Sequence, residues 1–339
     1  MRAIQITEPG VLAIIETVKP EQVAEGHVLI QVKAMGICGS DMHAYHGTSP
    51  LVTYPRIIGH EVVGEVAEVG AGVTGLQKGD RVVMDPVISC GECYACRVSR
   101  QNVCRNLRVR GVHAEGGFME YLMLPVWSVH KFSKDIPWEE AILIEPFTIA
   151  AQALSRGRVT SDDTLVIFGA GPIGLVTMQR AKSLGARVAI IDIVDERLKF
   201  AKDLGADLVI NPQQEDVMQK VASFTAGEGP SVIVEAVGIP RLLEQAVEMA
   251  SPAGRIVNLG FSSQPSQIAE LPITKKELDI IGSRLHNNKF PEVIGWFEKK
   301  EVNPKPLVTH VFDFHLIHEA IALMEAKPQE TCKVILRLQ

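Results

Sequence analysis

The chain has 339 residues, which is enough for two domains of ordinary size. Hydrophobic residues make up 46% and charged residues 22%, so we expect globular domains without long disorder. The formal net charge is -6, and no dense cluster of Lys and Arg is visible. We therefore expect neither nucleic acid nor an anionic membrane as a partner.

The first residues, MRAIQITEPG, lack a charged segment followed by a long apolar one, so no secretory signal is expected. No apolar run approaches the roughly 20 residues that a membrane helix needs. The cytoplasm is the predicted location. In that reducing compartment, the four cysteines between positions 90 and 104 are expected to be thiolate ligands rather than disulfides.

Two patterns of predicted secondary structure follow one another along the chain. Short strands separated by glycine turns come first and predict a β-rich, barrel-like domain; their segments are HVLIQVKAMG, EVVGEVAEVG, DRVVMDPV and FMEYLMLP. From about residue 163, short apolar strands alternate with amphipathic helices, as in a doubly wound parallel sheet covered on both faces. The six strands predicted for it are TLVIFGA, RVAIID, DLVIN, SVIVEAVG, RIVNLGF and LDIIGS. After about residue 285 come an amphipathic segment, PEVIGWFEKKEV, and a strand-like end, CKVILRLQ.

The sequence GAGPIG at 169–174 follows a predicted strand and opens a predicted helix. In such a loop, Gly169 permits a tight turn and Gly171 lets the backbone approach a pyrophosphate, while Gly174 lets the helix pack closely on the strand. Pro172 and Ile173 complete the loop at the helix N-terminus, whose free N–H groups favour phosphate. The context predicts a dinucleotide site rather than an empty glycine-rich turn.

Asp192 ends the next predicted strand and can accept hydrogen bonds from the adenosine ribose. Its charge would repel a 2′-phosphate, so NAD is the predicted cofactor. Arg197, five residues further on, could relieve that repulsion or flank the adenine, which leaves NADP open.

Two groups of residues are candidate zinc ligands. The first is a compact lobe with spacings of two, two and seven residues, typical of a closed structural zinc site; its members are Cys90, Cys93, Cys96 and Cys104. An iron–sulfur cluster would need a different spacing and a following Pro, and free core cysteines are the other alternative. The second group is scattered and offers S, N and O ligands, as in a catalytic site with one open position; it comprises Cys38, His60, Glu61 and Glu145. Taken singly these residues prove little, because a lone buried Cys or a hydrogen-bonded core His is commoner than a metal ligand.

Three motifs together carry a resemblance that spans the whole chain: GHEVVGEVAEVG at 59–70, the cysteines at 90–104 and GAGPIG at 169–174. In this order they resemble the zinc-containing medium-chain alcohol and polyol dehydrogenases. The resemblance implies a discontinuous GroES-like catalytic domain over 1–148 and 286–339, with a Rossmann domain inserted at 149–285. It also implies an active site in the cleft between them and a homodimer or homotetramer, usually joined through an edge strand such as LDIIGSRL.

At the matching positions, the resemblance makes Cys38 and His60 ligands of a catalytic zinc, beside one structural zinc in the cysteine lobe. Glu145 stands where the simplest alcohol dehydrogenases carry a second Cys. A Glu at this position resembles the sorbitol, threonine and sugar-acid dehydrogenase branches, in which metal coordination is shared variably among this Glu, the Glu after the His, and water. Whether Glu61 or Glu145 binds the metal stays open.

Several local phrases look most like the starvation-sensing oxidoreductases and the L-gulonate or L-galactonate 5-dehydrogenases; they are DPVISCGECYAC, GVHAEGGF, IEPFTIAA and SRLHNNKFP. The predicted reaction is therefore hydride transfer to NAD from a secondary alcohol of a small polyhydroxylated substrate, a sugar acid or polyol. A threonine-type amino-alcohol dehydrogenase and a non-catalytic NAD-binding sensor are the alternatives. A sensor would have no use for an open metal site.

Proton transfer and substrate binding suggest further residues. Ser40 and His43 resemble the proton relay of relatives, although Ser40 could instead cap a turn and His43 lie on the surface. Asp41 is predicted to orient His60 through the other ring nitrogen. Arg284 is the candidate partner for a substrate carboxylate, because a guanidinium can hold one bidentately, but a solvated Arg is an equal alternative. Weaker candidates for substrate binding are His113 and Asn287.

Overall fold

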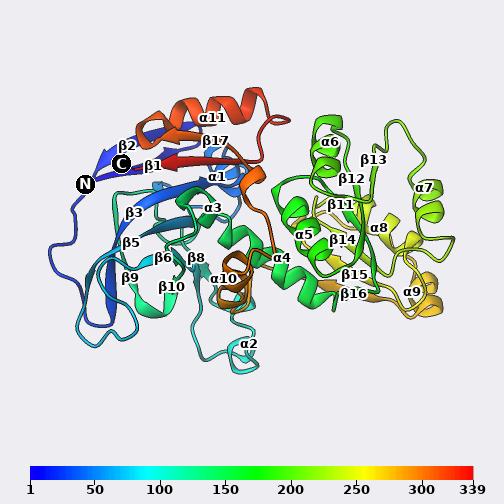
Figure 1. Cartoon of the computed structure of the whole chain (residues 1–339), viewed down its shortest axis with the longest axis horizontal. Helices are drawn as coiled ribbons and strands as arrows, with labels where there is room; N and C mark the ends of the chain where they lie inside the picture. Colours follow the sequence, from blue (N-terminus) through cyan, green and yellow to red (C-terminus); the bar gives the residue numbers. More distant parts are fainter. Residues whose placement is uncertain (339) are drawn as a thin grey trace. The chain divides into compact units, whose positions relative to one another are not determined.

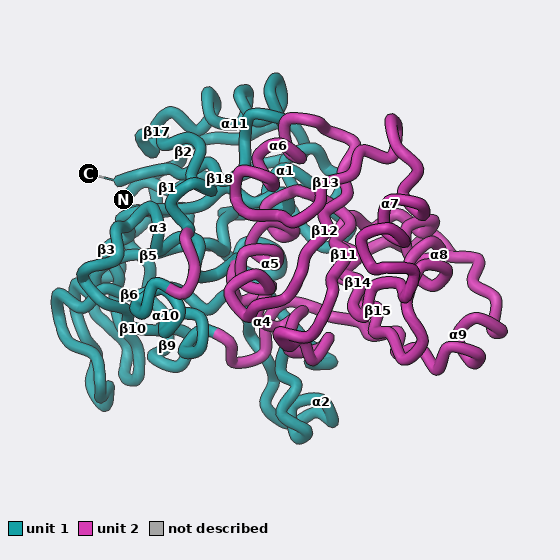
Figure 2. The backbone as a smooth tube through the Cα atoms, turned by 45° about the vertical axis from the view of Figure 1, so that its right-hand side comes forward, with its two compact units in different colours: residues 1–146, 290–300, 304–339 teal, residues 147–289, 301–303 magenta. Residues whose placement is uncertain are grey.

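The computed structural model describes residues 1–338, and the chain divides into two compact units (Figure 2). Unit 1 comprises residues 1–146, 290–300 and 304–339, and unit 2 comprises residues 147–289 and 301–303. The helix α4 (Ile144–Arg156) contains the first boundary. Within residues 1–338, no helix combines the length and the apolar character that crossing a bilayer requires.

Unit 1 is built around a seven-stranded sheet that joins distant parts of the chain (Figure 1). Strand β3 (His27–Ile37) lies near its centre, between β5 (Glu61–Val69) and the last strand, β18 (Lys333–Arg337), and pairs antiparallel with both. The strand-like end of the sequence is thereby confirmed. The other members are β10 (Val129–Lys131), β6 (Arg81–Met84), β17 (Val308–Asp313) and β9 (Tyr121–Pro125), which pairs with β3.

Smaller elements surround this sheet. Alternate residues of its strands point into one apolar core, which includes Val28, Ile30 and Val32 of β3. A three-stranded sheet has the order β2 (Val11–Glu16), β1 (Arg2–Glu8), β4 (Arg56–Ile57). A two-stranded sheet consists of β7 (Val87–Ile88) and β8 (Arg108–Val109). The helices are α1 (Gly39–Tyr45), α2 (Tyr94–Arg97), α3 (Trp138–Ala141), α10 (Phe290–Glu298) and α11 (Ile317–Ala326). The 3-10 turns are η1 (Gln101–Val103), η2 (Val126–Ser128), η3 (Lys305–Leu307) and η4 (Phe314–Leu316).

Unit 2 confirms the predicted doubly wound sheet. Six parallel strands lie in the order β13-β12-β11-β14-β15-β16, the arrangement of a Rossmann fold. Their bounds are β11 (Thr164–Phe168), β12 (Arg187–Ile191), β13 (Leu208–Ile210), β14 (Val232–Glu235), β15 (Arg255–Asn258) and β16 (Asp279–Gly282).

Helices cover both faces of this sheet, and Figure 1 shows α5 and α8 on opposite sides of it. They are α5 (Pro172–Ser183), α6 (Asp195–Asp203), α7 (Val217–Phe224), α8 (Pro240–Met249) and α9 (Glu270–Lys276). One face of the sheet packs on α7 and α8 through an apolar cluster that includes Val166, Ile233 and Ala246. Because both faces are buried there, the central strands β11, β12 and β14 read as continuous apolar runs in the sequence, whereas the edge strand β16 is mostly exposed.

Candidate metal centres and nucleotide site

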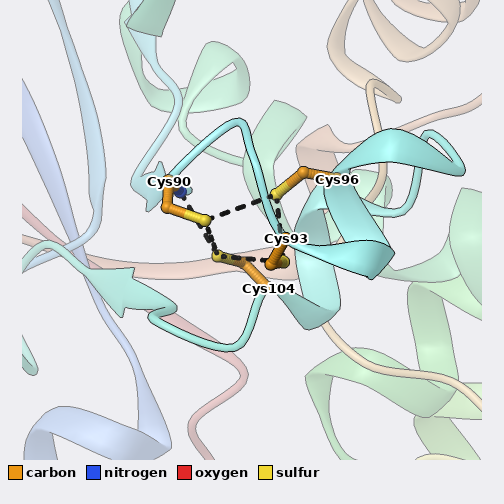
Figure 3. A group of neighbouring side chains, drawn as sticks. All are labelled: Cys90, Cys93, Cys96 and Cys104. Carbon is orange, nitrogen blue, oxygen red and sulfur yellow. Dashed lines mark hydrogen bonds between the residues drawn. The ribbon is translucent and has the colours of Figure 1, made fainter.

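The four predicted cysteines converge in unit 1 (Figure 3). Their side chains point toward one another from the loop before α2, from α2 itself and from the turn after η1. All four Sγ atoms lie within 4.8 Å of one another. The separations are 4.0 Å for Cys90 to Cys96, 3.5 Å for Cys93 to Cys96, 3.9 Å for Cys93 to Cys104 and 3.4 Å for Cys104 to Cys90.

These sulfur separations fit a tetrahedral zinc ion, since Zn–S bonds of 2.3 Å give S···S edges of about 3.8 Å. Backbone N–H groups support thiolate charge: Arg105 N donates to Cys93 Sγ at 3.4 Å and Cys90 N donates to Cys104 Sγ at 3.2 Å. Such backbone hydrogen bonds lower the pKa of Cys93 to about 6, whereas burial and neighbouring thiols raise the pKa of Cys96 to about 11. The donor set therefore suits a cation that neutralises several thiolates together.

The second candidate site lies where strand β3 ends and strand β5 begins. Cys38 follows β3 and is the N-cap of α1, whereas His60 precedes β5 and Glu61 opens it. The two strands are antiparallel with Gly36 opposite Glu61, so the end of one meets the start of the other. One ligand atom from each of Cys38, His60 and Glu61 lies within 4.8 Å of the other two.

Asp41 supports this arrangement mainly through the backbone. Its carboxylate accepts a hydrogen bond from Cys38 N at 2.9 Å, as the N3 residue of a capping box, and another from Gly59 N at 3.3 Å. Its Oδ1 lies 4.0 Å from Nδ1 of His60, beyond hydrogen-bond distance. Asp41 thus ties together the two segments that carry Cys38 and His60.

The site accumulates negative charge around one imidazole. Burial opposes a positive charge on His60, but Cys38, Asp41 and Glu145 outweigh this effect and raise the pKa of His60 well above its usual value. Burial also raises the pKa of the Asp41 carboxyl, although His60 opposes that shift. Nδ1 of His60 is buried without a hydrogen-bond partner among the described residues. Such a donor set favours a bound cation.

Sequence patterns alone do not single out Lys333, yet its ammonium contacts this group directly. Its side chain is 2% exposed, and Nζ donates to both carboxylate oxygens of Glu61 at 2.6 Å. Burial would lower the pKa of Lys333, but Glu61 and Cys38 raise it, so the ammonium stays charged. The available signal is a lysine directly before the apolar run VIL at 334–336.

Glu145, Ser40 and His43 occupy different surroundings. Glu145 is 4% exposed at the start of α4, and its charge raises the pKa of His60. The converging group of ligand atoms comprises Cys38, His60 and Glu61 and does not include Glu145. Ser40 and His43 lie one turn apart on α1, with exposed side chains. Nδ1 of His43 lies 3.0 Å from Oγ1 of Thr48, a partner that the sequence did not suggest.

The glycine-rich loop has the conformation that dinucleotide binding needs. Gly169 has φ +100°, and a Cβ on Gly174 would lie 1.9 Å from the carbonyl oxygen of Gly169. Gly171 caps the N-terminus of α5, with open space where a Cβ would stand. Asp192 accepts hydrogen bonds from Ala170 N at 2.7 Å and from Val194 N at 3.0 Å, which fixes its carboxylate beside the loop.

The remaining predicted residues lie on separate elements. Arg197 is partly buried on α6 of unit 2. Arg284, also in unit 2, has its guanidinium 5.3 Å from the ring centroid of Phe261. His113 belongs to unit 1, where its Nδ1 accepts a hydrogen bond from Val109 N at 3.2 Å.

Comparison with known proteins gives the class of this fold and site. Residues 24–134 match the alcohol dehydrogenase GroES-like domain, and residues 172–299 match the zinc-binding dehydrogenase domain. The chain therefore belongs to the zinc-dependent medium-chain alcohol dehydrogenase family, which makes it an oxidoreductase. The predicted pairing of a GroES-like domain with a Rossmann sheet is confirmed.

Individual relatives cover nearly the whole chain. It is 46% identical to the starvation-sensing protein RspB of Escherichia coli K12, with 99% of each covered. A crystal structure of the alcohol dehydrogenase rspB of E. coli CFT073 with NADH has a TM-score of 0.94 and 45% identity, covering 100% of this chain and 99% of that one. Identity is 38% to L-threonine 3-dehydrogenase of Pyrococcus horikoshii, covering 100% and 99%. It is 33% to 2-dehydro-3-deoxy-L-galactonate 5-dehydrogenase of Pseudoalteromonas atlantica, covering 90% and 89%.

Proposed function

We propose that this chain oxidises a secondary alcohol of a sugar acid or polyol and transfers the hydride to NAD, with a zinc ion held by Cys38 and His60. The observation that carries the proposal is the convergence of these two side chains and Glu61 within 4.8 Å. A thiolate, an imidazole and a carboxylate are the ligand types of catalytic zinc sites that keep one position for substrate. When bound there, zinc supplies the Lewis acidity that lowers the pKa of an alcohol.

Two carboxylates compete for the third protein position. Glu61 supplies an oxygen within the group, but both of its oxygens also accept hydrogen bonds from Lys333. We propose that Lys333 limits the negative charge that Glu61 presents to the metal, while Glu145 adds charge from the start of α4. Asp41 fixes the backbone at Cys38 and Gly59, and thereby the direction of both ligands.

The proton released from the alcohol needs a route to water. Ser40 and His43 lie on the exposed side of α1, immediately after Cys38. We propose that the hydroxyl of Ser40 accepts the proton while it gives up its own proton toward His43, whose neutral imidazole accepts that proton and releases it to solvent. The contact of His43 Nδ1 with Thr48 at 3.0 Å limits the orientation of the ring and favours Nε2 as the atom that exchanges with water.

For the cofactor, we propose that the N-terminus of α5 holds the pyrophosphate through the backbone at 169–174. Asp192 would accept hydrogen bonds from the ribose of NAD and disfavour a 2′-phosphate, with Arg197 beside the adenosine. The relative solved with NADH supports the same cofactor here.

The substrate class is supported by relatives as well as by residues. The 33% identical galactonate-derivative dehydrogenase acts at the 5-position of a sugar acid, and oxidation of L-gulonate or L-galactonate at that position is our narrow proposal. Arg284 of unit 2 is the proposed partner of the carboxylate, and His113 of unit 1 is proposed independently as a residue that contacts substrate. The 38% identity to a threonine dehydrogenase keeps an amino alcohol as the alternative substrate.

The test is a panel of aldonates, polyols and amino alcohols assayed for NAD reduction with the zinc-loaded protein. Activity on aldonates above all others would support the narrow proposal, and preference for threonine would replace it with the alternative. No turnover of any secondary alcohol by the zinc-loaded protein would overturn the proposal. A zinc content of only one ion per chain would then favour a nucleotide sensor.

We also propose the domain limits 1–148 with 286–339 for the catalytic domain and 149–285 for the nucleotide domain, in a cytoplasmic homodimer or homotetramer. Strand β16 ends the sheet of unit 2, and β15 is its partner within the chain. An edge strand of this kind can pair with a second copy. Light scattering on the purified protein would give the number of subunits.

A further inference from the structure

The three residues that precede His60 are held by the loop of residues 110–118, which we name the clamp loop. Its backbone runs beside 57–59 and donates hydrogen bonds to successive carbonyl oxygens there. The bonds are Gly116 N to Ile57 O at 2.7 Å, Phe118 N to Ile58 O at 3.1 Å and Gly117 N to Gly59 O at 2.9 Å. The backbone immediately before a candidate metal ligand is therefore fixed by a different segment of the chain.

A carboxylate of the same loop adds a further constraint. Glu115 accepts a hydrogen bond from Ile57 N at 2.7 Å through Oε2, and Oε1 accepts one from the guanidinium of Arg56 at 2.9 Å. The side chain of Glu115 is 52% exposed, so the ion pair itself contributes little. The bond to Ile57 N is the important one, because it orients the peptide that leads to His60.

Glycine permits the close approach of the two backbones. Gly59 has φ +94°, and a Cβ there would lie 1.8 Å from the ring of Phe118. A Cβ on Gly116 would lie 2.3 Å from the carbonyl oxygen of Ile58 and 2.5 Å from that of Gly59. A Cβ on Gly111 would meet the backbone of Gly59 at 2.8 Å. At Gly111 and Gly116 the obstacle is backbone, and at Gly59 it is the ring of the fully buried Phe118, so none of these neighbours can yield easily.

The loop also has internal order. Gly111 N donates to Ala114 O at 2.8 Å, and the ring of His113 accepts from Val109 N, so the loop is closed upon itself. The chain enters it from the four-cysteine lobe through β8. A loop that is rigid by itself can transmit its position to 57–59.

We propose that the clamp loop, through Glu115 and Gly116, is a positioning element for His60 and thereby sets how tightly the Cys38–His60–Glu61 group binds a metal ion. This inference rests on the proposed function, because it takes His60 as a metal ligand. Residues that orient a ligand from outside the coordination shell change metal affinity by about 10- to 100-fold when they are replaced. If the clamp loop served only to fold unit 1, substitutions in it would lower the thermal stability of the protein without altering metal binding at Cys38, His60 and Glu61.

The test uses full-length protein loaded with Co²⁺, whose visible absorption differs between a four-thiolate site and a mixed S, N, O site. For Gly116→Ala we expect the affinity of the second cobalt ion to fall at least tenfold and its absorption bands to shift. The thiolate bands of the four-cysteine lobe and the affinity for NAD should stay unchanged. Gly295→Ala in α10 of unit 1 is the matched control, because no atom beyond its own helix lies within 4 Å of a Cβ built at that position.

Glu115 provides a graded second test that introduces no steric clash. Glu115→Ala should lower the affinity for the second cobalt ion severalfold. Glu115→Gln keeps an acceptor for Ile57 N and should therefore retain most of the affinity of the parent protein. If both Glu115→Ala and Gly116→Ala keep the affinity and spectrum of the parent protein, the clamp-loop inference is wrong. If Gly116→Ala does not fold, Glu115→Ala decides alone. A parent protein that binds cobalt only in the cysteine lobe would instead contradict the proposed function.

Discussion

The two candidate metal sites of unit 1 are built in opposite ways. The four cysteines lie within fifteen consecutive residues, and backbone N–H groups of the same segment complete their hydrogen bonding. The group at Cys38, His60 and Glu61 instead depends on the register of β3 with β5 and on a lysine from β18, near the other end of the chain. A local site can form as soon as its loop closes, whereas the dispersed site exists only when the sheet is complete.

This difference predicts how each site responds to substitution. A change in the cysteine lobe should have local consequences, because its ligands and their hydrogen-bond donors belong to one segment. A change at the dispersed site should affect both chemistry and the fold of unit 1, because its charges lie in the sheet. The four predictions that follow test this contrast.

The largest effect is expected for Cys38→Ala. Loss of the thiolate should remove the second zinc ion and lower kcat by at least about a thousandfold, since a metal stabilises developing charge by several kcal/mol. NAD reduction and zinc content, one ion per chain in place of two, are the measurements. Cys332→Ala is the control for loss of a thiol and should keep both ions. Wild-type turnover by Cys38→Ala would contradict the metal assignment.

The next effect concerns stability. Lys333→Met leaves the Glu61 carboxylate buried without its ammonium partner, and we expect the free energy of unfolding to fall by about 3 kcal/mol. Urea unfolding of the metal-free protein measures it. The double variant Lys333→Met with Glu61→Gln should recover much of the loss, because it removes the unpaired charge. Additive losses in the two single variants would show that the pair is not coupled.

The third prediction uses the opposite pKa shifts in the cysteine lobe. With a pKa of about 6, Cys93 is mostly thiolate at pH 7, whereas Cys96, at about 11, stays protonated. After zinc is removed by a chelator, iodoacetamide should modify Cys93 about 100-fold faster than Cys96. The rate at Cys93 should fall as the pH drops below about 6, where its thiolate is lost. Mass spectrometry of tryptic peptides reads both rates, and equal rates at pH 7 would contradict the assignment.

The same contrast explains what the sequence could predict. The cysteine lobe, the glycine-rich loop and the six strands of unit 2 are local patterns of spacing or apolar runs, and the structure contains each of them. Only the family resemblance assigns Cys38 and His60 to one metal site, because no spacing rule links residues 38 and 60. Their proximity depends on the antiparallel register of β3 and β5.

Other features could not be predicted, because they depend on sheet register or on backbone packing. Lys333 reaches Glu61 only because β18 lies beside β3, with Val334 opposite Ile37. The clamp loop meets 57–59 through backbone contacts that glycines permit, and a glycine in a sequence does not reveal its neighbour. The sequence predicts that Asp41 orients the His60 ring through its other nitrogen. In the structure Asp41 Oδ1 lies 4.0 Å from Nδ1 of His60, and the Asp41 carboxylate accepts hydrogen bonds from the backbone of Cys38 and Gly59.

The smallest expected effect is that of Cys104→Ser, which tests how local the cysteine lobe is. Loss of one of four thiolates should release the structural zinc and leave the segment around Arg97, Arg100 and Arg105 held mainly by its own short turns. Trypsin should then cleave there about tenfold faster, which corresponds to a local opening that is easier by about 1.4 kcal/mol.

Sites in unit 2 should be cut no faster in this variant, and NAD affinity should stay within about twofold of the parent value, because the six-stranded sheet contains no part of the lobe. Cleavage that accelerates equally in both units would mean that zinc in the lobe stabilises the whole chain. The contrast between a self-contained site and a dispersed one would then be lost for stability, even if it held for catalysis.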